Sequence, residues 1–210
     1  MISSILETLS QFILATIEAW GYWGVFFLMF LDNANIPIPS EVIMPFSGFL
    51  AFTGTFSFWP VVWVGTAGSL FGSWLSYYMA IHFHRWTEKW MQGTIAYETS
   101  KKWFEKYGVA AAFWGRLIPG VRTFISFPAG MFKVNFAKFS IYTFIASFIW
   151  ALILTYPGYY LGENWESLGP IVHKYDVLIL GIIVAGGAAA FWLHHGKKKN
   201  DKASSSELET

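Results

Sequence analysis

The stretch DNANIPIPSE at residues 32–41 interrupts a long apolar segment and carries an acid at each end. A second apolar segment is interrupted by RLIPGVR at residues 116–122, which carries an arginine at each end. The apolar arms beside both stretches are too short to cross a membrane, because a spanning helix needs about 20 apolar residues. Short arms around a polar tip that contains proline predict two re-entrant hairpins, at residues 20–58 and 107–132.

The composition of the whole chain is that of a protein surrounded by lipid. Of its 210 residues, 55% are hydrophobic, 20% are aromatic and only 13% are charged, whereas a soluble domain carries about 25% charged residues. Cysteine is absent, which excludes disulfides and thiolate metal sites. The sequence contains no nucleotide-binding loop, hydrolase motif or zinc motif. It therefore predicts no enzyme, no metal, no cofactor and no nucleic-acid partner.

Outside the hairpins, the apolar periodicity predicts helices of two kinds. Residues 1–18 show a helical apolar spacing, and residues 85–106 mix aromatic and basic side chains, as helices on a membrane surface do. Packing of both helices on the protein itself is the alternative. Longer apolar segments predict spanning helices. The expected fold is all-α, with a single membrane domain at 1–195 followed by a disordered tail at 196–210. In chain order, the domain consists of an amphipathic helix at 1–18, a hairpin at 20–58, a span at 59–83, an interfacial linker at 85–106, a hairpin at 107–132, and spans at 136–160 and 177–195.

The distribution of Lys and Arg predicts how the chain is oriented. Basic residues gather at 85–106, at Lys133 and Lys138, and at 197–199, and the positive-inside rule assigns all of them to the cytoplasmic side. The C-terminus is then cytoplasmic, and the hairpins enter the membrane from opposite faces. Because the two hairpins also share the spacing of their Gly, Pro and charged residues, the chain is predicted to be an inverted repeat, as in many secondary transporters.

Two glycines in the predicted span 59–83 indicate close helix packing. Gly68 and Gly72 are four residues apart and so lie on one face of a helix. Small residues at this spacing let the backbones of two membrane helices approach each other. We expect the neighbouring helix to belong to the same chain, and a homo-oligomer is the alternative.

The opposite charges of the two tips predict that the tips meet inside the membrane. An ionisable side chain at the bilayer centre costs about 2.5–3.5 kcal/mol or more. Asp32 and Glu41 in the first tip would neutralise Arg116 and Arg122 in the second. A fixed network of ion pairs that only holds the broken helices together is the structural alternative, although buried ion pairs are often no more stabilising than apolar packing.

The functional interpretation gives each tip residue a role. The guanidinium groups of Arg116 and Arg122 suit a lipid phosphate, because arginine offers a rigid fork of donors and stays charged. Protonation of Asp32 or Glu41 would release the arginines and couple lipid movement to protons. Ser40 and Thr123 complete the predicted phosphate site, and the further candidates for hydrogen bonds to a headgroup are Asn33, Asn35 and Ser47.

The strings around the tips resemble the DedA family, also called the VTT-domain family. The markers are Gly115-Arg116-x-x-Pro119-Gly120-x-Arg122, Asp32 and Pro39-Ser40-Glu41, within a likeness that covers residues 20–162. The resemblance implies a multi-pass protein of the bacterial cytoplasmic membrane. It also implies a flippase that returns undecaprenyl phosphate, the carrier lipid of cell-wall biogenesis, from the outer to the inner leaflet. The acids and arginines that the family needs map onto Asp32, Glu41, Arg116 and Arg122.

The sequence departs from the family at one tip and leaves other functions open. Ser40 stands where the family usually has glycine, which predicts a less permissive turn. Within transport, the substrate is alternatively another anionic phospholipid or a proton-coupled small ion. A membrane enzyme that acts on a lipid phosphate is a third hypothesis, for which the sequence offers no obvious nucleophile or base, and a scaffold that transports nothing is a fourth.

Overall fold

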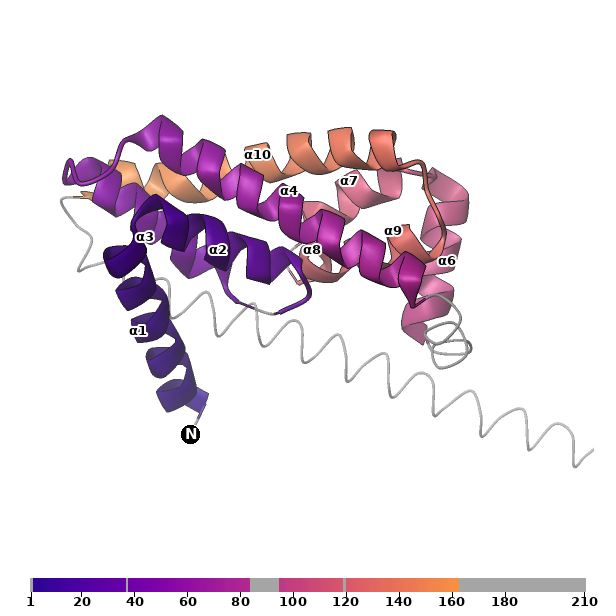
Figure 1. The fold of residues 1–210 in the computed structure, drawn as a ribbon, viewed down its shortest axis with the longest axis horizontal. Coiled ribbons are helices and arrows are strands. Elements are labelled where there is room, and N and C mark those ends of the chain that lie inside the picture. Colours follow the sequence, from indigo (N-terminus) through magenta and orange to yellow (C-terminus); the bar gives the residue numbers. More distant parts are fainter. Residues whose placement is uncertain (1, 37, 84–94, 119, 163–210) are drawn as a thin grey trace, which may run out of the picture. The chain divides into compact units, whose positions relative to one another are not determined.

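A computed structural model of the chain describes residues 2–36, 38–83, 95–118 and 120–162 (Figure 1). The regular elements of these ranges are all α-helices, which confirms the all-helical class. Membrane insertion of the hairpins and the number of spans remain predictions. The predicted span 177–195 and tail 196–210 lie outside the described residues, as does part of the predicted linker 85–106.

The first predicted hairpin is a pair of helices that returns the chain to where it began. Helix α2 (Tyr22–Asn33) and helix α3 (Ser40–Phe52) are joined by a loop in which Asn35 adopts a positive φ of 70°. At the start of α2, the ring of Tyr22 stacks on Phe56 with centroids 4.6 Å apart. The backbone N–H of Ser57 donates to the Tyr22 hydroxyl at 2.7 Å. The two ends of the segment therefore meet, and its polar tip lies away from them.

The second predicted hairpin is built from shorter helices in the same way. Helix α7 (Ala110–Arg116) leads into the tip, and α8 (Val121–Phe124) and α9 (Ser126–Met131) lead back. Gly120 supplies the turn with a φ of 79°, in the left-handed region where a residue without Cβ is unstrained. The rings of Phe104, on helix α6 (Ile95–Tyr107), and Phe132 lie 5.6 Å apart, so the ends of this segment meet too.

A long helix follows each hairpin. Helix α4 (Phe58–His82) follows the first, and α10 (Phe136–Tyr160) follows the second after an N-cap in which Asn135 accepts from the backbone N–H of Lys138 at 3.0 Å. Helix α2 packs on α4 and α7 on α10, whereas α3 packs on α10 and α9 on α4. Two related halves would make such reciprocal contacts, and their opposite insertion into a membrane remains a prediction.

The two long helices differ in how apolar they are. Within the described residues, α10 is the one helix both long and apolar enough to cross a membrane, judged by length and composition alone. Helix α4 is just as long, at 25 residues. It carries buried hydroxyl groups, among them those of Ser69, Ser73 and Ser76, and does not pass the same test. The spans expected at 59–83 and 136–160 thus coincide with helices, and their passage through a membrane remains a prediction.

Two apolar residues of the N-terminal helix α1 (Ile2–Trp20) are buried in the protein. Ile13 and Ile17 are both 0% exposed and belong to the cluster formed with α2 and α3. Of the two interpretations of the amphipathic segment 1–18, the contacts favour packing on the protein for this part of its surface.

Gly68 and Gly72 bring α4 against α2 within the same chain. A Cβ atom at either position would meet a backbone carbonyl oxygen, that of Phe26 or of Phe30. The predicted close packing inside the protein is therefore confirmed.

We expect Gly72→Leu to lower the thermal stability of the purified protein. The added side chain has to push α2 aside, and overpacking of this kind costs about 1–3 kcal/mol, which corresponds to roughly 2–10 °C in a chain of this size. Thermal unfolding in detergent, followed by size-exclusion chromatography, measures the effect. Leu75→Ile, on the exposed side of α4, is the control and should change little. Equal melting temperatures for both variants would contradict the packing argument.

Candidate functional site

The hairpin tips bring Arg122 of α8 against both acids of the first hairpin. The Nη2 atom of Arg122 lies 3.1 Å from Asp32 Oδ2 and 3.6 Å from Glu41 Oε1. The same nitrogen donates to the hydroxyl of Ser40, the first residue of α3. The guanidinium carbon lies 5.1 Å from the centroid of the Trp150 ring, on α10. Arg122 is thus bound to the first hairpin and stacked on α10 while only 5% exposed.

The two acids have different surroundings. Asp32 is 1% exposed and accepts hydrogen bonds from Thr123 Oγ1 at 3.2 Å and from Asn33 Nδ2 at 3.3 Å. The Glu41 side chain is 22% exposed. Since exposure weakens an ion pair through solvent screening, Asp32 is the firmer partner of Arg122.

Arg116, at the end of α7, is surrounded by neutral partners. It donates to Asn33 Oδ1 at 3.0 Å, to Ser73 Oγ at 2.6 Å and to Ser126 Oγ at 2.5 Å. It is 3% exposed, and no ion pair joins it to an acid within the described residues. The Nε–H groups of both Arg116 and Arg122 are buried without a hydrogen-bond acceptor. A buried cation with unused donors and no bound carboxylate is a favourable site for an anion.

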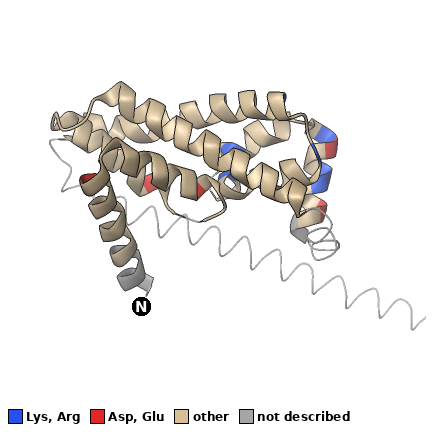
Figure 2. Cartoon of the chain, in the orientation of Figure 1, with Lys and Arg blue, Asp and Glu red and all other residues tan. Residues whose placement is uncertain are grey.

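A small cavity is lined by both arginines. Its volume is about 10 Å³, roughly what one water molecule requires. Arg116, Arg122, Trp150 and Asn33 line it together with small side chains of α4 and α10. A phosphate group is several times larger than water, so the site is closed here, with Arg122 held by the acids. Figure 2 shows these charges among the central helices, while most other described charges lie on α6.

Comparison with known proteins identifies the family. The VTT domain matches residues 38–160, which is more than half of the chain and includes most of the site. This chain belongs to the VTT-domain, or DedA, family. The resemblance noted in the sequence is thereby confirmed.

Three relatives of this VTT-domain protein illustrate how the family is named. An "alkaline phosphatase-like protein" of Lactococcus lactis is 34% identical over 189 residues, covering 83% of this chain and 88% of the relative. The "undecaprenyl phosphate transporter A" of Bacillus subtilis is 28% identical, covering 82% and 88%. The "inner membrane protein YqjA" of Escherichia coli is 26% identical, covering 78% and 75%. No solved structure matches the chain significantly.

The residues predicted as the site of the VTT-domain protein lie in one cluster. The side chains of Asp32, Glu41, Ser40 and Thr123 make the contacts described with Arg122 or with each other, and Arg116 joins them through Asn33. Ser47 and Asn35 are the exceptions, because Ser47 donates to the Ile43 carbonyl of its own helix at 2.7 Å and Asn35 accepts from Ser76 at 3.0 Å. The expectation for Ser40 is also corrected. It lies in a helix without a positive φ, so a side chain there strains no turn.

Sequence reasoning missed three residues of the cluster. Ser73 and Ser126 accept from Arg116, and Trp150 covers Arg122. Ser73 could have been found from the sequence, because it belongs to a row of hydroxyl groups that recurs at helical spacing on α4. Nothing in the sequence singles out Trp150, because aromatic residues make up 20% of the chain.

We expect Trp150→Ala to weaken the closed form of the site. The substitution removes the ring stacked on Arg122, worth about 0.5–2 kcal/mol, together with the indole N–H that donates to Ser40 at 3.4 Å. The melting temperature should fall by a few degrees, and Trp150→Phe, which keeps a ring, should lose less. Thermal unfolding in detergent measures both variants. An unchanged melting temperature in Trp150→Ala would show that the ring does not hold Arg122.

Proposed function

We propose that this VTT-domain protein carries an anionic lipid, with undecaprenyl phosphate as the leading candidate, from the outer to the inner leaflet of the bacterial cytoplasmic membrane. Arg116 and Arg122 bind the phosphate, Ser40 and Thr123 donate to it, and Asp32 and Glu41 exchange protons. The observation that carries the proposal is Arg116, a fully buried cation whose partners are all neutral. A purely structural network would gain more from pairing this charge with an acid, because breaking such a pairing in the interior is strongly destabilising.

The charges of the cluster suggest why protons would take part. Two arginines and two carboxylates sum to zero, so an incoming phosphate adds an uncompensated negative charge. Uptake of a proton by Asp32 or Glu41 offsets one unit of the phosphate's negative charge and removes a competitor for Arg122, whose Nη2 both carboxylates contact. Binding of the lipid phosphate is therefore coupled to protonation of the acids.

The names of relatives support this choice of substrate. A relative named for undecaprenyl phosphate transport matches 82% of this chain. The family match spans the tip of the second hairpin, in which both arginines lie. In undecaprenyl phosphate the apolar tail is joined directly to the phosphate. Such a molecule suits a site in which buried cations are surrounded by apolar helices.

A vesicle assay tests the proposal. Purified protein is reconstituted into phosphatidylcholine vesicles that contain fluorescent undecaprenyl phosphate, and the loss of outer-leaflet label is followed with a membrane-impermeant quencher. We expect faster movement than in protein-free vesicles, with further acceleration when the pH differs across the membrane. Unlabelled undecaprenyl phosphate should compete better than phosphatidylglycerol. Movement at the protein-free rate would refute the proposal. Stronger competition by phosphatidylglycerol than by undecaprenyl phosphate would assign another anionic lipid as the substrate.

The name of the Lactococcus relative favours one second candidate, a lipid-phosphate phosphatase. Within the described part of the chain, no three His, Asp or Glu side chains are grouped as a metal site requires. The same vesicles discriminate the two functions, because a phosphatase releases inorganic phosphate and a transporter does not. We expect no release above that of protein-free vesicles, and stoichiometric release would make the protein an enzyme.

A further inference from the structure

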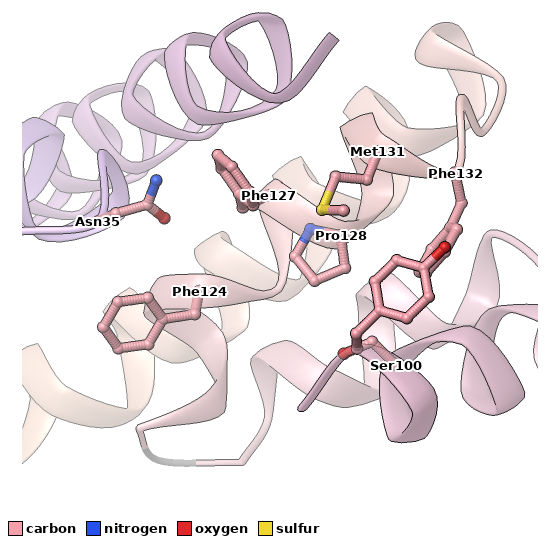
Figure 3. Close-up of a pocket in the computed structure, with 8 residues that line it drawn as sticks. Asn35, Ser100, Phe124, Phe127, Pro128, Met131 and Phe132 are labelled. Atoms are coloured by element: carbon pink, nitrogen blue, oxygen red, sulfur yellow. The ribbon is translucent and has the colours of Figure 1, made fainter. Parts of the chain in front are cut away.

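A larger cavity lies beside the charged cluster and has a different character. Its volume is about 400 Å³, within the range of ligand pockets. Its walls are almost entirely apolar. The polar groups among its lining residues are the side chains of Asn35 and Ser100 and the hydroxyl of Tyr97. Figure 3 shows Phe127 and Pro128 in its middle, with Asn35 on one side and Ser100 on the other.

The short helices α8 and α9 build both the cluster and this cavity. Arg122 and Ser126 are buried and face the cluster, where Arg122 is bound to the acids and Ser126 accepts from Arg116. Phe124 and Phe127 line the cavity instead. Because these residues alternate along one stretch of chain, a single helical layer separates the charged site from the apolar cavity.

The cavity and Arg116 are contacted by polar side chains from the same two parts of the chain. Asn35, at the rim, accepts a hydrogen bond from Ser76 at 3.0 Å. One turn along α4, Ser73 accepts from Arg116 at 2.6 Å. Two residues before Asn35, Asn33 accepts from Arg116 as well. The rim of the cavity and the cation site therefore share the same two elements, α4 and the tip of the first hairpin.

We propose that this cavity holds the first part of the hydrocarbon tail of the lipid whose phosphate binds Arg116 and Arg122. The inference rests on the proposed function and locates the rest of the same substrate. In a polyprenyl phosphate the tail begins at the phosphate oxygen, so its cavity has to lie close to the cation site. This cavity lies one helical layer from that site and is lined by the same short helices, α8 and α9, that carry Arg122 and Ser126. A comparable apolar cavity of about 500 Å³, lined by Trp20, Trp23, Phe26 and Phe27, has no lining residue next to the cluster.

The tail is oriented by the cavity and held mainly through its phosphate. Transfer of the substrate tail from the bilayer into the apolar cavity brings little hydrophobic gain, because the surrounding lipid tails are themselves apolar. Occupancy of the cavity by substrate tail therefore depends on the charged cluster. An ordinary bilayer lipid in the same cavity would not depend on it, which gives the test.

Photolabelling in phosphatidylcholine nanodiscs tests the inference. The probe is a polyprenyl phosphate with a diazirine in its second isoprene unit, and labelled residues are mapped by mass spectrometry. We expect labelling of Phe124, Phe127 or Met131. A tenfold excess of undecaprenyl phosphate should reduce it about tenfold, whereas undecaprenol, which has the tail without the phosphate, should not. Labelling at Trp23 and Phe27 is the internal control and should respond to neither competitor.

The outcomes separate this inference from the proposed function. Labelling of the cavity that undecaprenyl phosphate does not displace would assign the cavity to bulk lipid and overturn the inference, as would competed labelling at another place. Displaced labelling without transport in vesicles would leave the tail site standing and refute the transport function. In the Arg116→Gln variant, undecaprenyl phosphate should no longer reduce the labelling of the cavity. If that variant fails to fold, the competition measured with wild-type protein is sufficient to decide whether the cavity holds the substrate tail.

Discussion

Replacement of Arg116 by Gln is expected to reduce lipid movement to the rate of protein-free vesicles. Gln keeps hydrogen-bonding capacity towards Asn33, Ser73 and Ser126 but removes the charge that we propose binds the phosphate. Hydrogen bonds to charged groups are worth about 1.5–3 kcal/mol each. Loss of one or two of them weakens binding by roughly 10-fold to 10⁴-fold. Arg116→Lys should restore part of the rate, since it keeps the charge without the planar fork.

The control for this prediction is Lys138→Gln. Lys138 is an exposed cation at the start of α10, away from the cluster, and its loss should leave the rate within about twofold of wild type. The vesicle assay is run with variants whose melting temperatures are known. Transport by a folded Arg116→Gln protein at the wild-type rate would remove Arg116 from the site.

Replacement of Asp32 by Asn is expected to make lipid binding stronger and less dependent on pH. The change mimics a protonated acid, so among the acids of the cluster Arg122 keeps only Glu41, at 3.6 Å and partly exposed. Breaking a buried pair destabilises a protein by about 3–5 kcal/mol, and the unliganded variant should therefore melt below wild type. Undecaprenyl phosphate should then raise its melting temperature more than that of wild type, because the phosphate replaces the missing charge.

Transport by the Asp32→Asn protein should also lose its response to a pH gradient. Glu41→Gln is the comparison, and it should have the smaller effect on stability because the Glu41 side chain is 22% exposed. Thermal unfolding with and without lipid at two pH values measures the first effect, and the vesicle assay measures the second. A wild-type response to the pH gradient in Asp32→Asn would assign proton coupling to another group.

The meeting of the hairpin tips could be expected from the sequence because it follows from a strong constraint. Charges such as Asp32 and Arg122 within apolar segments have to find partners. Prolines in both tips allow the chain to turn there. The end contacts of the hairpins depend on aromatic pairs such as Tyr22 with Phe56, which no spacing rule selects in a chain so rich in aromatic residues.

The distribution of the charges within the cluster could not be foreseen. Balancing two acids against two arginines predicts neutrality but not that both acids bind Arg122, leaving Arg116 to neutral groups. Which acid meets which arginine depends on how far each hairpin tip extends past the other. The packing of the hairpins on α4 and α10 determines these positions. The row of hydroxyl groups on α4 was readable as a polar face, but its contact with Arg116 was not.

The contacts of Arg122 with Asp32, Glu41 and Ser40 all converge on one atom, Nη2, whereas Arg116 spreads its bonds over two nitrogens. A small turn of the Arg122 guanidinium moves that single atom away from three oxygens together. Displacement of this one atom therefore breaks all three contacts with the first hairpin, whereas displacement of one Arg116 nitrogen leaves the other nitrogen bonded.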